Sequence, residues 1–222
     1  MKILTVADEE SPVLWDYYRP GCLDEYDLII SCGDLKASYL TFLSTMSRCR
    51  VLYVHGNHDE RYDNDPPQGC DIIDDHIVVF NGLRILGLGG CRRYSKGTYQ
   101  YTEAQMRRRI ARLGPVLHRT KGVDIVVAHA PVRGIGDLED PAHQGFEAFR
   151  TLIDRWHPQY FLHGHVHLRY DSSLQRTAEY NGTAIINASE RYVLEIPSKE
   201  TTPYERSRLE YITHFRESFR LW

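Results

Sequence analysis

The sequence lacks any apolar run that approaches the length of a membrane span. The short stretch after Lys2 reaches a charge at Asp8, too early for the apolar region of a secretory signal. Its five cysteines are odd in number and form no Cys-x-x-Cys pair, which favours free thiols over a disulfide framework or a zinc ribbon. An excess of basic residues is also missing, because the formal net charge is −3 without a long run of one sign. This balance argues against a protein that binds nucleic acid through its phosphates. We therefore expect a cytoplasmic protein with no membrane partner and no sequence-specific nucleic-acid partner.

The composition fits one globular domain. At 222 residues, with 42% hydrophobic and 26% charged residues, the chain can bury a sizeable core, and it contains no internal repeat, low-complexity tract or linker. We predict one domain over residues 1–200 and a separate helical tail over residues 201–222. The tail is predicted from apolar residues at roughly helical spacing, which are Leu209, Ile212, Phe215, Phe219 and Trp222. A helix packed on its own domain is the favoured interpretation, and a homo-oligomer interface is the alternative.

The first half of the chain alternates apolar strands with helices. Continuous apolar runs over residues 3–7, 27–31 and 51–54 predict strands that are buried on both faces. Between them, we expect a short helical stretch around residues 12–18 and a helix over residues 37–46. This β-α-β-α-β order predicts an α/β fold with parallel pairing.

The second half adds hairpins. Asn81-Gly82 separates two apolar runs, residues 77–80 and 83–88, and is a strong two-residue hairpin signal; a second hairpin is expected at Asn181-Gly182. The remaining patterns predict helices over residues 102–117 and 144–156, and strands over residues 123–128, 160–162, 183–187 and 192–196. The second half therefore mixes hairpins with βα units.

Five short polar clusters each follow an apolar strand. They are Asp8, Gly33-Asp34, Gly56-Asn57-His58-Asp59, His129 and Gly164-His165-Val166-His167. Side chains just past the carboxyl ends of strands converge on one crevice in an open α/β sheet. Each cluster alone is a weak signal, since a Gly-Asp pair is usually a turn and a lone histidine is usually structural. Together, their carboxylate, amide and imidazole groups suit manganese, iron or zinc.

In this order the clusters resemble the motifs of the calcineurin-like metallophosphoesterase superfamily, which are Asp-x-His, Gly-Asp, Gly-Asn-His-Asp/Glu, a lone His and Gly-His-x-His. The resemblance covers residues 1 to about 196. It implies a four-layer α/β/β/α sandwich of two mixed β-sheets. It also implies two divalent metal ions, with manganese or iron expected and zinc or nickel as alternatives. The first metal would be held by Asp8, Asp34 and His167, and the second by Asp34, Asn57, His129 and His165.

The resemblance implies the chemistry as well. A hydroxide that bridges the two metals would attack the phosphorus of a small phosphomonoester or phosphodiester in line with the leaving group. His58 would protonate the leaving oxygen as general acid, and Asp59 would orient its imidazole. Arg93, which follows the Gly89-Gly90 turn, is the candidate for binding the substrate phosphate, although a solvated arginine is the commoner case. The alternative to a hydrolase is a binding scaffold that has the fold without the activity.

One position departs from the family pattern. Glu10 stands where the family has histidine, two residues after the first aspartate. If Glu10 ligates the first metal, that position becomes richer in oxygen donors and favours manganese or iron over zinc. The other interpretation is that Glu10 points away and the first position is weak or empty. Ligation by Glu10, directly or through water, is the favoured prediction.

Overall fold

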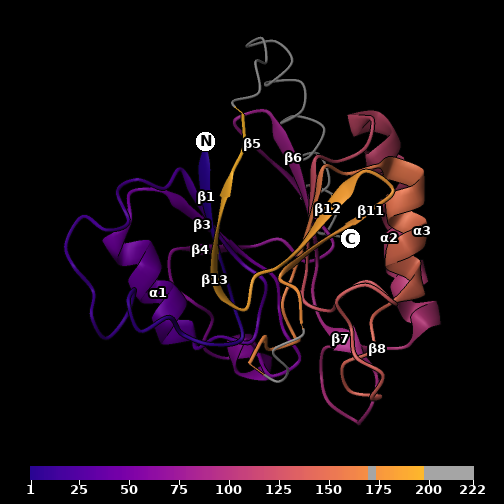
Figure 1. The fold of residues 1–222 in the computed structure, drawn as a ribbon, viewed down its shortest axis with the longest axis horizontal. Coiled ribbons are helices and arrows are strands. Elements are labelled where there is room, and N and C mark those ends of the chain that lie inside the picture. Colours follow the sequence, from indigo (N-terminus) through magenta and orange to yellow (C-terminus); the bar gives the residue numbers. More distant parts are fainter. Residues whose placement is uncertain (170–173, 198–222) are drawn as a thin grey trace.

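Two β-sheets stacked face to face form the centre of the molecule, and helices cover both outer faces (Figure 1). The computed structural model describes residues 1–169 and 174–197, so the predicted helical tail over residues 201–222 lies outside the described residues. The layers follow the order helix, sheet, sheet, helix, which confirms the expected four-layer α/β/β/α sandwich. No helix in the described residues is both long enough and apolar enough to cross a membrane.

The first sheet holds most of the N-terminal half of the chain. Its strand order is β13 (Glu190–Glu195), β1 (Lys2–Ala7), β2 (Leu28–Ser31), β3 (Arg50–Tyr53) and β4 (Cys70–Ile72). Strands β1 to β4 run parallel, as the β-α-β order predicts, and β13 pairs antiparallel with β1. Helix α1 (Ala37–Met46) covers the outer face, against which it buries Tyr39, Leu40 and Leu43.

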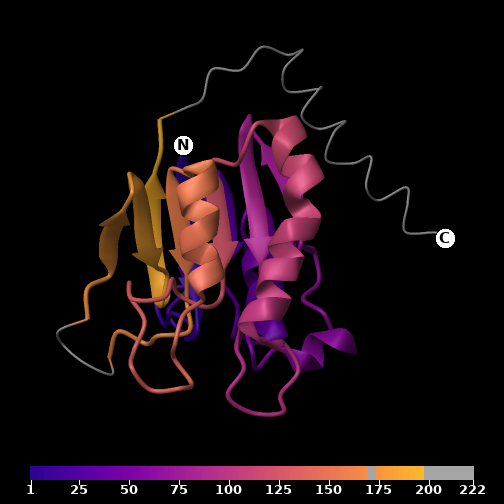
Figure 2. The ribbon, with the colours of Figure 1, turned by 90° about the vertical axis from the view of Figure 1, so that its right-hand side faces the viewer.

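The second sheet holds the rest of the chain. Its strand order is β11 (Thr177–Tyr180), β12 (Thr183–Asn187), β10 (Tyr160–His163), β9 (Ile125–Ala128), β6 (Leu83–Leu88) and β5 (Ile77–Phe80). Helices α2 (Glu103–Thr120) and α3 (Glu147–Trp156) lie side by side on its outer face (Figure 2). Two small elements complete the described fold: a ribbon of β7 (Cys91–Arg92) and β8 (Gln100–Tyr101), and the 3-10 helix η1 (Glu60–Asp63).

Three layers of apolar side chains hold the stack together. Between the sheets, Ile30 of the first sheet belongs to the same buried cluster as Ile125 and Leu162 of the second. Neighbouring residues in a strand point to opposite faces, so in β1 Ile3 joins this inner layer while Leu4 packs toward α1. Because both faces of each sheet are covered, the central strands are apolar on both sides, which is why continuous apolar runs could predict them.

Both Asn-Gly hairpins form where they are predicted. The φ angles are 46° at Asn81 and 79° at Gly82, and 49° at Asn181 and 78° at Gly182. Two consecutive positive φ angles are the mark of the type I′ turn, which matches the twist of the flanking strands and which asparagine and glycine adopt readily. The two turns join β5 to β6 and β11 to β12.

Some parts of the chain differ from the sequence prediction. Residues 12–18 form successive turns rather than a short helix. The N–H groups of Leu14 and Trp15 both bond to the carbonyl of Ser11, and the Trp15 ring packs edge-on against Phe42 of α1. Tertiary packing decides the local structure here, because intrinsic helix propensity is only a weak bias. The last strand of the described residues, β13, crosses back to the first sheet to pair with β1, which the sequence pattern did not indicate.

Candidate metal centre

The five polar clusters lie at one edge of the stacked sheets, where β1, β2, β3, β9 and β10 end. Three of their side chains stand on residues with a left-handed backbone, since φ is 66° at Asp8, 57° at Asp34 and 69° at His165. This conformation is uncommon for residues with a Cβ, although aspartate and histidine adopt it more readily than most. Backbone strain of this kind concentrates at functional sites, where the surrounding structure enforces it.

Two glycines let the loops approach each other closely. A Cβ on Gly56 would lie 1.9 Å from Oδ1 of Asp34, and a Cβ on Gly164 would lie 2.9 Å from Oδ2 of Asp8. Any larger residue would displace the carboxylate, because glycine alone has no Cβ. The glycines of the Gly-Asn-His-Asp and Gly-His-x-His motifs therefore make room for the two aspartates.

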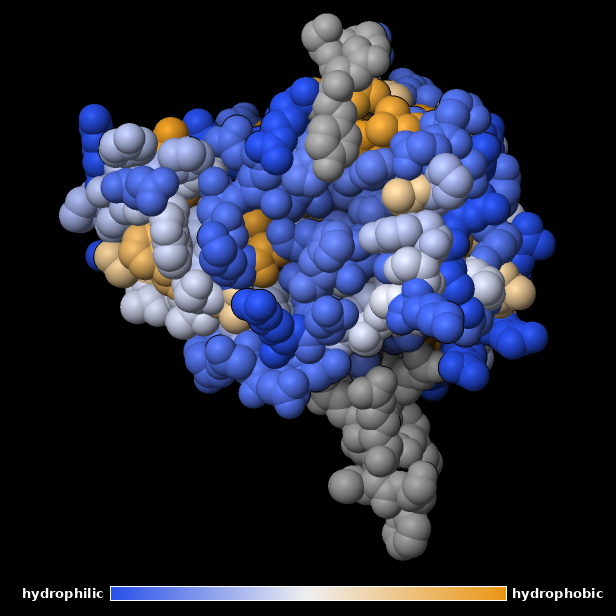
Figure 3. Space-filling model, turned by 90° about the horizontal axis from the view of Figure 1, so that it is seen from below, coloured by the Kyte–Doolittle hydropathy of each residue, from blue (hydrophilic) through white to orange (hydrophobic). Residues whose placement is uncertain are grey.

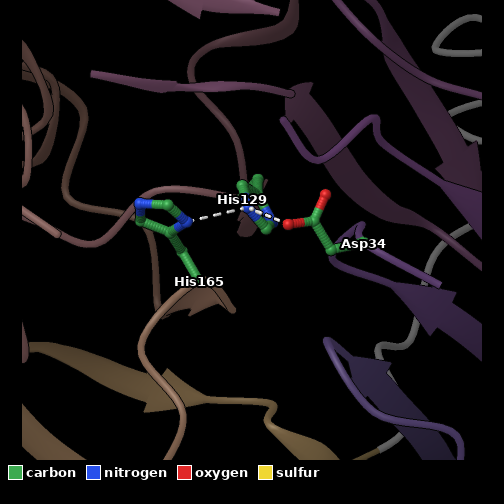
Figure 4. Close-up of side chains that lie close together, drawn as sticks. All are labelled: Asp34, His129 and His165. Atoms are coloured by element: carbon green, nitrogen blue, oxygen red, sulfur yellow. Dashed lines mark hydrogen bonds and ion pairs between the residues drawn. The ribbon is translucent and has the colours of Figure 1, made fainter. Parts of the chain in front are cut away.

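Four donor atoms converge at this edge, and we call their residues, Asp34, Asn57, His129 and His165, the donor cluster. Nε2 of His129 lies 3.0 Å from Oδ1 of Asn57, 3.1 Å from Nδ1 of His165 and 3.3 Å from Oδ2 of Asp34. Figure 4 shows Asp34 and His165 on opposite sides of His129. Donor atoms about 2.1 Å from one ion lie about 3 Å apart, so this spacing fits a metal ligand set. The donor atoms of Asp34, His129 and His165 all lie within 4.8 Å of one another.

Hydrogen bonds to the backbone fix which ring nitrogen faces the donor cluster. Nδ1 of His129 lies 2.8 Å from the carbonyl oxygen of Cys32, and Nε2 of His165 lies 2.7 Å from that of Ala142. A carbonyl oxygen only accepts hydrogen bonds, so each of these nitrogens carries a proton. Nε2 of His129 and Nδ1 of His165 are thereby directed at the cluster, as is usual for histidines that ligate a metal.

The side chains of the donor cluster stabilise a positive charge. Burial lowers the pKa of His129, but the charge of Asp34 and its hydrogen bond outweigh burial and raise the pKa to about 9. Burial raises the pKa of Asp34, but the charge and hydrogen bond of His129 outweigh it and lower the pKa to about 2. Burial and the charge of His129 lower the pKa of His165 to about 3, which keeps that ring neutral. An environment that favours a cation at this point suits a metal ion.

The carboxylate of Asp8 has one oxygen without a partner. Oδ1 accepts a hydrogen bond from the N–H of His165 at 2.8 Å, whereas Oδ2 is the one buried side-chain oxygen or nitrogen in the described residues that has no hydrogen-bond partner. Burial raises the pKa of this carboxyl to about 6. A buried carboxylate oxygen without a partner is unfavourable, and a bound cation would satisfy it. The donor cluster and this oxygen therefore fit a divalent metal ion, whereas in the described residues Asp8 and His167 do not belong to the group of donor atoms that lie within 4.8 Å of one another.

The two glutamates of the first motif turn to different partners. The carboxylate of Glu10 accepts hydrogen bonds from the backbone nitrogen and Nζ of Lys36 at 3.2 and 3.4 Å. Oε1 of Glu9 lies 2.6 Å from Nδ1 of His167, and its Oε2 accepts from Arg169 at 3.0 Å. The structure thus brings Glu9 to His167, and metal ligation by Glu10 stays a prediction. Glu9 and Glu10 are the same residue type and adjacent in one loop, so the sequence alone could not indicate which of them contacts His167.

His58 lies at the mouth of the site. Its backbone N–H donates to Oδ1 of Asp34 at 2.8 Å, and its exposed side chain lines a pocket of about 520 Å³ together with those of Lys36 and Arg61. Figure 3 views the molecule from this end, and the residues coloured there are mostly hydrophilic. Such a face suits a charged or polar small molecule.

Asp59 holds two of the loops together. Its Oδ2 accepts hydrogen bonds from the N–H groups of Gly56 at 2.7 Å and Asp34 at 2.8 Å. Burial and the charge of Asp34 raise its pKa to about 6. Both hydrogen bonds run to the backbone, so the structure gives Asp59 a role in loop geometry. Its expected role in orienting the imidazole of His58 stays a prediction.

The loop between β7 and β8 contributes Arg93 and Tyr94. A guanidinium nitrogen of Arg93 lies 3.3 Å from both the carbonyl of Gln100 and Oε1 of Gln105, so substrate binding by this residue stays a prediction. The Tyr94 hydroxyl lies 3.3 Å from Nδ2 of Asn57, which leaves Oδ1 of the amide facing the rest of the donor cluster. The sequence analysis missed Tyr94, because an aromatic residue in a polar loop belongs to no motif.

Two more histidines adjoin the ligands. His55, which precedes Gly56, pairs with Asp74 at 2.8 Å, as expected for a structural histidine at a strand end. The ring of His143, on the loop between β9 and α3, lies 5.2 Å from the ring of His165. The sequence analysis did not single out His143, because no motif surrounds it.

Two stacked mixed sheets with carboxylate, amide and imidazole donors gathered at their strand ends define a protein of the metallophosphoesterase fold. Residues 9–169 match the family described as calcineurin-like phosphoesterase, and the chain belongs to this family. The resemblance found in the sequence motifs is thereby confirmed. A search of the curated proteins finds no match to this chain.

The fold recurs in solved structures at low sequence identity. TT1561 of Thermus thermophilus superposes with a TM-score of 0.55 at 14% identity, over 85% of this chain and 89% of that one. GAP50, described as the anchor in the inner membrane complex of Plasmodium, superposes with a TM-score of 0.52 at 12% identity, over 85% of this chain and 71% of that one. At this identity the likeness shows the fold alone, so a function has to be argued from the site.

Proposed function

We propose that the chain is a metal-dependent phosphoesterase that hydrolyses a small phosphomonoester or phosphodiester. The observation that carries this proposal is the donor cluster, in which Asp34, Asn57 and His165 surround Nε2 of His129 at 3.0 to 3.3 Å. Family membership supports it, because calcineurin-like phosphoesterases are typically hydrolases that bind divalent metals.

The proposed cofactors are two divalent ions, manganese or iron, with zinc or nickel as alternatives. When bound, two such ions supply Lewis-acid stabilisation for the phosphoryl oxygens and lower the pKa of a coordinated water. Asp34 is suited to serve both ions, because its Oδ2 faces His129 of the second set and its charge is close enough to Asp8 of the first set to raise the pKa of that carboxyl. The first ligand set would be Asp8, Asp34 and His167, and the second would be the donor cluster.

We propose that His58 acts on the leaving group. Its imidazole is exposed in the pocket of about 520 Å³ that Asp34 also lines. From there it can donate a proton to the leaving oxygen as the phosphorus–oxygen bond breaks. Lys36 and Arg61 line the same pocket and would contact a polar leaving group.

A hydrolysis assay tests the proposal. The metal-free chain is reconstituted with manganese, iron, zinc or nickel and assayed on p-nitrophenyl phosphate and bis(p-nitrophenyl) phosphate. We expect metal-dependent turnover of at least one substrate and its loss in Asp34→Asn, which keeps the shape of the side chain without its charge. Asp71→Asn, in an exposed ion pair with Arg50, is the matched control. Metal binding without turnover of any ester would support the alternative, a binding scaffold.

A further inference from the structure

Glu9 joins the first motif of the site to the last. Its Oε1 lies 2.6 Å from Nδ1 of His167, and its Oε2 accepts a hydrogen bond from Nη1 of Arg169 at 3.0 Å. These partners follow β10 of the second sheet, whereas Glu9 follows β1 of the first. The side chains of Glu9 and His167 are 29% and 20% exposed, so the contact is partly shielded from water.

A left-handed turn at Asp8 comes directly before the two glutamates. With φ at 66°, the chain reverses there, and the N–H of Glu9 bonds to the carbonyl of Ala7 at 2.7 Å. Glu10 then leaves the turn toward Lys36. Glu10, which stands where the family has histidine, therefore contacts Lys36. Glu9 contacts His167, the last histidine of the motifs.

The contact with Glu9 determines which ring nitrogen of His167 can ligate. A carboxylate only accepts hydrogen bonds, so Nδ1 of His167 carries a proton and Nε2 is the nitrogen through which the ring would ligate. The rings of His129 and His165 are fixed in the same manner by carbonyl groups. Glu9 differs from those carbonyls because it is charged, and a carboxylate partner makes a ligating imidazole more basic.

We propose that Glu9 is a positioning residue that makes His167 a ligand of the first metal and compensates for the histidine absent at position 10. The inference rests on the metal site of the proposed function, but it does not depend on hydrolysis. The second ligand set does not depend on Glu9, because carbonyl groups orient His129 and His165 and the donor atoms of Asp34, His129 and His165 already lie within 4.8 Å of one another. The two metal positions therefore differ in strength, and the weaker one depends on Glu9.

Metal titration of Glu9→Ala against Glu10→Ala tests this inference. Metal-free protein is titrated with Mn²⁺ by calorimetry. We expect the wild type and Glu10→Ala to bind two equivalents, because Glu10 is bonded to Lys36, and this result would count against the predicted ligation by Glu10. Glu9→Ala should keep the tighter equivalent and bind the other about 10–100-fold more weakly. Nitrogen-15 NMR of the metal-free protein gives a second readout, in which the proton of His167 leaves Nδ1 for Nε2 in Glu9→Ala while the ring of His165 stays unchanged.

Three results would overturn the inference. They are a Glu9→Ala variant that binds both equivalents with wild-type affinity, a Glu10→Ala variant that loses one equivalent instead, and a wild type that binds a single ion. Thermal unfolding of each variant establishes that it is folded before it is titrated. A wild type that binds two ions and hydrolyses no ester would contradict the proposed function and leave the role of Glu9 intact.

Discussion

His58 connects the metal-binding loops to the pocket, where its imidazole is exposed. We predict that His58→Gln lowers turnover of an alkyl phosphate by about 10²–10⁴-fold, because the departing alkoxide needs a proton. The loss should be much smaller for p-nitrophenyl phosphate, whose leaving group departs as a stable anion. Steady-state assays on both substrates measure the difference, with the exposed His118→Gln as the matched control. An equal loss on both substrates would show that another group is the acid.

The buried carboxyl of Asp59 should make the stability of the metal-free protein depend on pH. Burial raises its pKa from the ordinary 3.8 to about 6 in the folded state. The folded state therefore favours the protonated carboxyl of Asp59. The stability that this protonation contributes is fully present below pH 3.8 and is lost as the pH rises through 6. The full shift corresponds to about 3 kcal/mol. Asp59→Asn resembles the protonated form, and we predict that it raises the unfolding free energy at pH 7 by up to about 3 kcal/mol.

Urea unfolding of the metal-free protein at low and at neutral pH measures this effect. The gain from Asp59→Asn should vanish near pH 4, where the carboxyl is protonated in the folded state. Asp65→Asn, an exposed aspartate beyond η1, is the matched control and should show no gain at either pH. A gain that is the same at both values would mean that the buried charge is not its cause.

Single residues could be predicted where a motif carries them. Asn57, His129 and His165 follow strands within or between recognisable motifs, and the structure places their donor atoms together. Glu9 could not be predicted, because choosing it over Glu10 requires the left-handed turn that precedes it. The sequence names residue types and order, whereas the direction of a loop side chain depends on the backbone angles around it.

At the scale of elements, the loop between β7 and β8 holds Tyr94 against Asn57. The side-chain carbonyl of buried Gln100 accepts hydrogen bonds from the N–H groups of Tyr94 at 3.2 Å and Ser95 at 2.9 Å. We predict that Tyr94→Phe lowers the metal affinity of the donor cluster by about 10-fold, because the hydroxyl that fixes the Asn57 amide is lost. Calorimetric titration measures this, with the exposed Tyr17→Phe as control. Unchanged affinity would show that the amide is held without Tyr94.

Elements could be predicted as far as local sequence decides them. Helix α1 has the predicted bounds, and α2 continues three residues beyond the predicted end, to Thr120. Both Asn-Gly turns formed because their backbone angles are a local property of those two residues. Strand β4 has no apolar pattern, since Asp71 and Ile72 are both exposed, and only its pairing with β3 makes it a strand. Long-range pairing of this kind leaves no local signal.

At the scale of the whole molecule, the domain over residues 1–200 and the helical tail over residues 201–222 remain predictions, because the description ends at residue 197. The cytoplasmic location is also a prediction. Light scattering on the full chain and on residues 1–197 tests the tail. The favoured interpretation, a helix packed on its own domain, predicts the same oligomeric state for both chains. A larger assembly for the full chain alone would support the homo-oligomer interface.

The metal centre lies across the seam between the two sheets. Asp8, Asp34 and Asn57 follow strands of the first sheet, whereas His129 and His165 follow strands of the second. The ion pair of His129 with Asp34 joins this seam, as does the hydrogen bond that the N–H of His165 donates to Asp8. The apolar cluster between the sheets determines their relative position, and with it the distances between ligands from the two sheets. The sequence could therefore indicate the ligands but not the distances between them.

Metal binding should stabilise the whole fold, because its ligands come from both sheets. A ligand that binds only the folded state stabilises it by RT ln(1 + [L]/Kd), or about 2.7 kcal/mol at 100 times Kd. For a chain of this size we predict that Mn²⁺ at that level raises the Tm of the metal-free protein by roughly 5–10 °C. Scanning calorimetry measures the rise, which Asp34→Asn should abolish and Asp71→Asn should keep. An equal rise in Asp34→Asn would place the ion elsewhere on the molecule, and no rise in the wild type would contradict the donor cluster as a metal site.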